Sequence, residues 1–278
     1  MPRSATRTLV LMPVAIALNI VLGSTVQQVL KLPIYLDSVG TILTGVLAGP
    51  IAGLATGGLT DLIWAYVLPP PLQAPTAGPF AITAAVIGLL AGLWGWLGLF
   101  RPRRTTDTTS LLVAMPAAAM VALVIAYTFS RAYTSPQGFN SVTGFSVNAF
   151  RLSEFAFALV MVVFIVLAAW LLVARRDAGA VLALAAGLLT GIVAALVSAP
   201  IAAFVFGGVT GFGGDVIVAA FREAGSNLYQ ATLQQGLLSD PLDKMITSLV
   251  VFFVLAAMPR RLLARFPNGD RLVRGEPA

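Results

Sequence analysis

The sequence predicts an all-α protein, a polytopic bundle of transmembrane helices. Of its 278 residues, 58% are hydrophobic and only 10% are charged, whereas a soluble domain carries about 25% charged residues. A chain of this length has no water-soluble core large enough for so much apolar surface. The apolar residues also fall into runs of roughly twenty, the length that crosses ~30 Å of hydrocarbon. We therefore expect one transmembrane domain over residues 1–266, followed by a short, disordered polar tail over residues 267–278.

Seven apolar runs follow one another along the chain. The first follows Arg3 and Arg7 like a signal peptide, but no cleavage site is evident, so we interpret it as a span. The second holds thirty residues and is interrupted by Gly49-Pro50, so it is either one long span or two short ones. The runs cover residues 8–29, 37–66, 79–100, 111–129, 149–174, 180–206 and 244–258.

The distribution of basic residues favours a turn at Gly49-Pro50. With that turn in the cytoplasm there are about eight spans, both termini are cytoplasmic, and twelve basic residues lie inside against five outside, as the positive-inside rule requires. A single long span instead places Arg101, Arg103 and Arg104 outside. The two short segments, 37–48 and 51–67, need tilt, local thinning or shelter from neighbouring helices. We expect a multi-pass protein of a bacterial cytoplasmic (inner) membrane.

Three long polar connections, 68–78, 130–148 and 207–243, fall on the outer side, and binding residues concentrate in such loops. The third begins with the glycine-rich stretch 207–214, which predicts either a hinge near a ligand or an unwound helix end. Asp215 is then a candidate N-cap. We expect helices over 216–224 and 227–237, forming either a lid or a pair of amphipathic helices in the headgroup plane.

A ligand site at the outer face is predicted from aromatic, amide and ionisable side chains. Asp61 lies within a short membrane segment. A carboxylate there either is functional or has a structural role, in which it caps a helix or pairs with an arginine. Arg151 and Glu154 share one helix face, as ligand contacts or as an ion pair. Aromatic faces would stack on a planar ring and amides would fix its edge. The candidate substrate-binding residues are Tyr35, Asp37, Asp61, Trp64, Asn140, Arg151, Glu154, Asn227, Tyr229 and Gln230.

One face of the first span carries small or polar residues at every fourth position: Ala15, Asn19 and Gly23. Small residues allow helices to approach closely in lipid, and an amide in hydrocarbon needs a partner. The pattern predicts a helix contact on this face, either inside the chain or with another protein.

Several kinds of chemistry are excluded by the sequence. Cysteine and histidine are both absent, which removes disulfides and His- or Cys-held metals or haem. There is no GK[ST] phosphate loop, no HExxH and no GxSxG. We therefore expect no enzyme activity, no metal and no cofactor. Topology explains the net charge of +6 better than nucleic-acid binding does.

Three stretches of this chain resemble the substrate-binding S component of energy-coupling-factor (ECF) ABC transporters. They are LPIYLDSVGTILTGVLAGPIAGLATGGLTDLIW (32–64), PFAITAAVIGLLAGL (79–93), and the region from SAPIAAFVFGGVTGFGGD through DPLDKMITSLVVFF to MPRRLLARF (198–266). Members of that family usually have six spans, so the resemblance implies that 111–174 is an extra hairpin.

The resemblance also implies a division of labour. The chain would capture a vitamin or related micronutrient outside, while a coupling transmembrane subunit and two ATPase subunits supply the work. The family's first span docks on the coupling subunit, which would assign Ala15, Asn19 and Gly23 to partner coupling. Two alternatives remain: a stand-alone secondary transporter, which needs matched broken helices and midplane carboxylates, and a ligand sensor, which needs a signalling domain.

Overall fold

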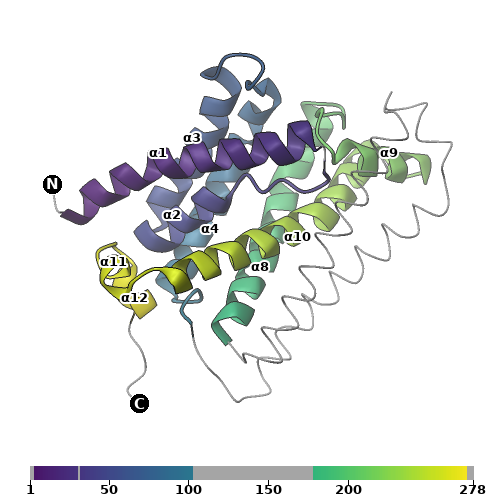
Figure 1. Cartoon of the computed structure of the whole chain (residues 1–278). Helices are drawn as coiled ribbons and strands as arrows, with labels where there is room; N and C mark the ends of the chain where they lie inside the picture. Colours follow the sequence, from purple (N-terminus) through teal and green to yellow (C-terminus); the bar gives the residue numbers. More distant parts are fainter. Residues whose placement is uncertain (1–2, 31, 103–177, 274–278) are drawn as a thin grey trace.

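The computed structural model describes residues 3–30, 32–102 and 178–273, and every regular element in these ranges is helical (Figure 1). This confirms the all-α prediction for the described part of the chain. The elements are α1 (Arg3–Gly23), the π-helix η1 (Ser24–Val29), α2 (Val39–Ala48), α3 (Pro50–Tyr66), the 3₁₀-helix η2 (Pro75–Phe80), α4 (Ala81–Trp96), α8 (Ala178–Phe204), α9 (Asp215–Glu223), α10 (Leu228–Ala257), α11 (Arg260–Leu263) and α12 (Gly269–Val273).

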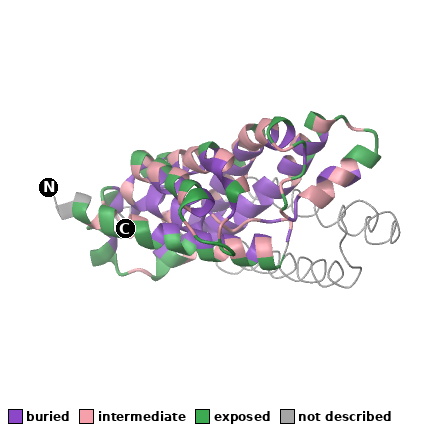
Figure 2. Cartoon of the chain, turned by 90° about the horizontal axis from the view of Figure 1, so that it is seen from above, coloured by how far each residue is buried: buried purple, intermediate pink, exposed green. Residues whose placement is uncertain are grey.

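Three helical stretches of the described part are long and apolar enough to cross a membrane: Thr6–Val29, Pro75–Trp96 and Gly179–Phe204. Buried residues lie on the facing sides of the helices, while exposed ones follow their outer sides and ends (Figure 2). Large apolar side chains such as Val10, Val14 and Leu196 are exposed on the outer sides, as lipid-facing residues are. The predicted spans 111–129 and 149–174 lie outside the described residues.

The break predicted at Gly49-Pro50 is confirmed, because α2 ends at Ala48 and α3 begins at Pro50. Gly49 has φ +100°, a conformation that a residue with a Cβ rarely adopts, and Pro50 suits the first turn of a helix. At 1.5 Å per residue, α2 and α3 are roughly 15 and 25 Å long. Each is shorter than ~30 Å of hydrocarbon, and α1 and α4 pack against both of them.

Helices α3 and α4 meet through their backbones. A Cβ added at Gly53 would overlap the carbonyl of Gly88, and one added at Gly57 would overlap the carbonyl of Ala84. Glycine therefore permits a backbone distance that alanine would not. This close pair forms one side of the bundle.

The small-residue face of α1 is turned inward. Asn19 is fully buried; its amide donates to Thr41 Oγ1 (2.8 Å) and Thr60 Oγ1 (3.1 Å), and its oxygen accepts the backbone N–H of Gly40 (2.6 Å). Ala15 is also buried, and the backbone of Gly40 lies against it. Of the two contacts that the sequence allows, the structure shows the internal one. This corrects the assignment of these residues to a partner.

Helix α10 is a single element of 30 residues that runs through Pro241. The sequence separates a helix over 227–237 from a last span over 244–258, so that division is wrong. Asn227 caps the helix: its side chain accepts the N–H of Gln230, whose side chain in turn accepts the N–H of Asn227. This reciprocal arrangement is a capping box.

The residues after Phe266 are packed onto the bundle, which corrects the predicted disordered tail up to Val273. Asn268 donates from its backbone N–H to Leu47 O (3.0 Å) and from its side chain to Val46 O (3.1 Å). Within a helix, Val46 O would accept an N–H from position 50, but Pro50 has none. Asn268 therefore supplies the hydrogen bonds that the α2–α3 turn leaves unmade.

The bundle has two distinct ends (Figure 1). At one end, α11 and α12 lie beside the start of α1, where the Arg7 guanidinium donates to Arg265 O (3.1 Å). Arg271 lies over the Trp96 ring at the end of α4 (4.7 Å). At the opposite end, α9 joins α8 to α10. The chain segments near both termini therefore share one end of the molecule.

Candidate functional site

A cavity of about 100 Å³ lies between the helices, toward the end that carries α9. By a similar measure one water needs roughly 10–15 Å³, and an apolar cavity of about 150 Å³ holds benzene. There is thus room for several waters, and the space is somewhat smaller than one that takes a benzene ring. The polar and charged lining residues are Gln27, Tyr35, Asp37, Ser38, Asp61, Thr83, Ser198, Thr210, Asp215, Thr232, Gln235, Asp240 and Lys244.

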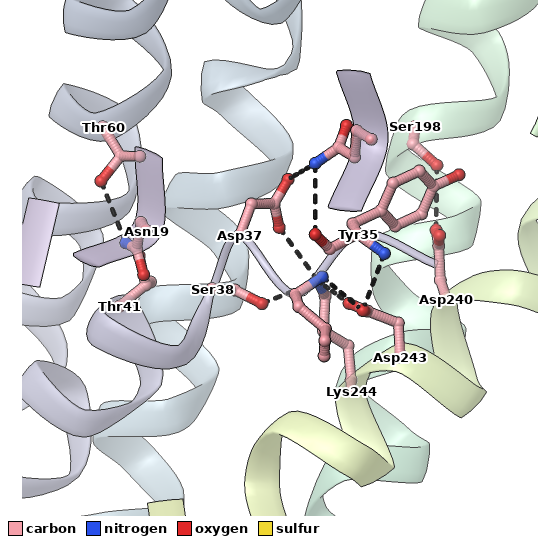
Figure 3. A network of polar contacts seen from close by, with 12 residues as sticks. Asn19, Tyr35, Asp37, Ser38, Thr41, Thr60, Ser198, Asp240, Asp243 and Lys244 are labelled. Carbon is pink, nitrogen blue, oxygen red and sulfur yellow. Dashed lines mark hydrogen bonds and ion pairs between the residues drawn. The ribbon is translucent and has the colours of Figure 1, made fainter. Parts of the chain in front are cut away.

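Lys244 is the centre of a cluster of polar residues at the cavity, which we call the polar wall (Figure 3). The cluster consists of Tyr35, Asp37, Ser38, Asp243 and Lys244. Its ammonium donates to Asp243 Oδ2 at 2.5 Å and to Ser38 Oγ at 2.8 Å, and it lies 3.6 Å from Asp37 Oδ1. Lys244 and Asp243 are almost completely buried. A charge this deep in a protein persists when partners surround it, and here α10 and the segment before α2 supply them.

The segment before α2 is held in place by Asp243. Its Oδ1 accepts the backbone N–H of Tyr35 (3.0 Å) and of Leu36 (2.7 Å). Leu36 has φ +52°, a left-handed conformation that costs free energy for a residue with a branched side chain. The two hydrogen bonds oppose that cost. Strain of this kind is common where a chain is shaped around a ligand.

Three further polar contacts continue the wall. The amide of Gln27 donates to Asp37 Oδ2 (2.8 Å) from the π-helix η1, a rare conformation that is frequent at functional sites. The amide of Gln235 donates to the Tyr35 hydroxyl (2.9 Å), and Ser198 Oγ donates to Asp240 Oδ2 (3.2 Å). Side chains from η1, α8 and α10 thus converge at the cavity.

Aromatic rings also line the cavity. The Trp64 side chain is 1% exposed, and its indole N–H donates to Leu72 O (2.9 Å). Its ring lies 6.5 Å from that of Phe212, tilted by 36°. Phe80 stacks on Phe206 at 5.5 Å. A flat, apolar group entering the cavity would therefore meet ring faces and edges.

Residues 207–214 and α9 cover the cavity at its end. Asp215 accepts hydrogen bonds from the N–H and hydroxyl of Thr210 (2.9 and 2.7 Å) and from the N–H of Gly211 (2.7 Å). Asp215 is the first residue of α9 and follows the N-cap Gly214, so the prediction that Asp215 is the N-cap was wrong. Its side chain instead holds the loop before α9 in place. Burial raises the pKa of Asp215, against the effect of these hydrogen bonds.

Asp61 and Thr83 differ from the other polar lining residues because no contact satisfies them. Each is 7% exposed and lines the cavity. Thr83 Oγ1 has no hydrogen-bond partner, and among the described residues no hydrogen bond or ion pair is found for the Asp61 carboxylate. A buried polar group without a partner is costly, so both indicate a site for a missing polar group.

The predicted site residues fall into three groups. Tyr35, Asp37, Asp61 and Trp64 lie together around the cavity. Asn227, Tyr229 and Gln230 do not line it: two form the capping box, and Tyr229, 39% exposed, stacks on Phe204. The third group, Asn140, Arg151 and Glu154, lies outside the described residues.

Several residues at the cavity were missed by the sequence reasoning, above all the lining residues Asp240 and Lys244 and Asp243, the partner of Lys244. Because the last span was predicted to begin at Lys244, these three were interpreted as its opening at the membrane interface. Their spacing of three and four places them on one helical face, directly before an apolar run. That pattern was the available signal. Gln27 and Gln235, each next to a second glutamine, carried a weaker signal.

No metal site is evident in the described ranges, where no three acidic side chains are placed to hold an ion. Comparison of the chain with family models, curated proteins and solved structures found no significant match. The geometry of the cavity is therefore the main guide to what the chain does.

Proposed function

We propose that this chain is the substrate-capturing membrane component of an importer of the ECF type. A small organic molecule, a vitamin or related micronutrient, binds in the cavity from the outer face. A coupling transmembrane subunit and two ATPase subunits supply the work. The chain itself binds its ligand without chemical change.

The observation that carries this proposal is the cavity, lined by both polar and aromatic side chains, at one end of an apolar helical bundle. Ligand sites for small molecules combine an apolar lining with a few fixed polar groups. Here the fixed groups come from segments distant in sequence, since Asp243 binds the backbone at Tyr35. The sequence contains no phosphate-binding loop of its own, which supports a separate source of energy.

The topology that accompanies this function has about eight spans with both termini in the cytoplasm. Six of them are α1, α2, α3, α4, α8 and α10, and the predicted hairpin over 111–174 adds two. The end that holds α11 and α12 would then face the cytoplasm of a bacterium, and the cavity would face outward. The basic residues of α11, Arg260 and Arg261, suit the inner side.

The test is affinity purification of the tagged chain from native membranes in mild detergent, followed by uptake measurements. We expect two ATPases and a second membrane protein in the eluate. We also expect a ligand whose uptake into cells stops when ATP is depleted. A chain that stays alone after crosslinking, together with uptake unaffected by ATP, would contradict the proposal.

A secondary transporter is the second candidate, and the buried carboxylates of Asp61 and Asp240 favour it. Carboxylates at such depth are used to couple transport to protons or ions. The two candidates differ in proteoliposomes that contain this chain alone. Accumulation of ligand driven by an ion gradient would select the secondary transporter.

A further inference from the structure

We propose that the ligand is an organic monocation, an amidinium, ammonium or charged ring nitrogen borne on an aromatic group, whose charge lies against Asp61. This inference rests on the proposed function, because it names the ligand class of the same cavity. It is argued from the charges, contacts and rings of the lining.

Acidic side chains outnumber basic ones in the lining. In the described part of the chain, the carboxylates of Asp37, Asp61, Asp215 and Asp240 line the cavity, and Lys244 is the one cation among the lining residues. An excess of one sign in a low-dielectric cleft attracts ligands of the opposite sign. The lining therefore favours a positive ligand over a neutral or a negative one.

Lys244 is not available to an anionic ligand. An ammonium has three N–H donors, and here two of them contact Asp243 and Ser38 while Asp37 lies within ion-pair distance. An entering carboxylate or phosphate would have to displace a partner that is already buried. It would also lie among the remaining carboxylates without a counter-charge.

The other carboxyl groups have partners, so the one left without a contact is that of Asp61. Asp37 accepts from Gln27, Asp240 accepts from Ser198, and Asp215 accepts from Thr210 and Gly211. Asp61 has no such contact within the described ranges and is 7% exposed. A cation placed beside it would stabilise the ionised form of this buried carboxyl group.

The surroundings of Asp61 suit a cation carried on a ring. Trp64 follows it by three residues, so the two side chains share one face of α3, and Phe212 lies beside the Trp64 ring. Aromatic faces attract cations, tryptophan most strongly. The unpaired hydroxyl of Thr83 can accept an N–H from the same group. Carboxylate, rings and hydroxyl form one recognition surface.

Three probes of nearly identical shape test the sign of the charge: benzamidine, which is cationic at neutral pH, the neutral benzamide, and the anionic benzoate. Their dissociation constants are measured by isothermal titration calorimetry on the full chain in lipid nanodiscs. The variants are wild type, Asp61→Asn, and the control Asp270→Asn, which removes an exposed carboxylate of α12. Thermal unfolding checks that each variant is folded.

We expect benzamidine to bind wild type and D270N at least about tenfold more tightly than benzamide, the preference that a charge-assisted contact gives. Benzoate should bind weakest. In D61N that preference should fall to within about twofold while benzamide affinity is kept. Retained benzamide binding distinguishes loss of the charge from loss of the fold.

Equal affinities of the three probes, tighter binding of benzoate, an unchanged preference in D61N, or no binding of benzamidine to wild type would overturn the inference. These outcomes are separate from those of the proposed function. Recovery of the ATPases with a neutral or anionic ligand would support the importer and contradict the cationic ligand. A preference for the cationic probe in a chain that is recovered without ATPases would support the cationic ligand and contradict the importer.

Discussion

The carboxylate of Asp243 accepts the backbone N–H of Tyr35 at 3.0 Å, across 208 positions of sequence. The same carboxylate receives the ammonium of Lys244 through its other oxygen. One side chain of α10 thus fixes both the backbone at Tyr35 and the ammonium of Lys244, which is the centre of the polar wall. The shape and the charge of the polar wall depend on the same group.

Replacing Asp243 by alanine should lower stability strongly. It leaves the buried Lys244 without its nearest partner, and removing one member of a buried pair costs about 3–5 kcal/mol. Thermal unfolding in detergent measures the loss, with Asp270→Ala as the exposed control. The double variant D243N/K244M should recover part of it, since no uncompensated ammonium remains. Equal unfolding temperatures for D243A and wild type would show that the pair is not structural.

Two glycines of α3 should respond to alanine in opposite directions. Gly53→Ala would bring a Cβ onto the carbonyl of Gly88, so α3 and α4 must separate and stability should fall. Gly58→Ala meets ordinary contacts at 3.6 and 3.7 Å and should gain up to about 1 kcal/mol from helix propensity. The comparison is made by thermal unfolding. A neutral G53A would contradict the backbone contact.

Asn19→Ala should destabilise the isolated chain, because it removes three buried hydrogen bonds and leaves the Gly40 N–H unpaired. One such unsatisfied group costs about 1–3 kcal/mol. Val14→Ala, on the exposed face of the same helix, is the matched control and should have little effect. If N19A changed only the association with a partner and not the unfolding temperature, the interior role would be wrong.

Deleting residues 267–278 should lower stability, whereas deleting 274–278 alone should not. Only the longer deletion removes Asn268 and exposes the carbonyls of Val46 and Leu47. The expected difference is about 1–3 kcal/mol for each group left unpaired in a buried position. Unfolding of the two truncated chains measures it. Indistinguishable stabilities would mean that the contact contributes nothing.

Stability should depend on pH through Asp215. Burial raises the pKa of its carboxyl above the ordinary value of 3.8, so between these two values the folded state holds more protons than the unfolded state. The free energy of unfolding contributed by this group therefore falls as pH rises through that window. Wild type should gain stability relative to Asp215→Asn on acidification from neutral pH. A difference independent of pH would contradict this.

The parts of the fold that the sequence predicted are those set by local signals. Gly49-Pro50 ends one helix and begins another because of the backbone limits of these two residues. The apolar runs predicted α1, α4 and α8 because hydrocarbon length fixes the length of a span. The tail after Phe266 was misread because the partners of Asn268 lie in α2, far away in sequence.

The site was predicted in part for the same reason. Asp61 and Trp64 were found because a carboxylate and an indole are conspicuous in an apolar segment. Asn227 and Gln230 had suitable chemistry, but the first turn of α10 uses them locally. The network around Lys244 was not found, since it depends on α10 continuing through Pro241 and on a loop distant in sequence. Long-range pairing of this kind has no local signature.

The glycine contact between α3 and α4 has a mechanical consequence. Two helices in backbone contact have no side chains between them whose rotamers could change to allow the helices to slide past each other. We therefore expect α3 and α4 to move as one rigid unit. Trp64 and Asp61 belong to that rigid unit. We therefore expect the entrance to widen by movement of residues 207–214, which the hydrogen bonds of Asp215 join to α9, while α3 and α4 stay in place.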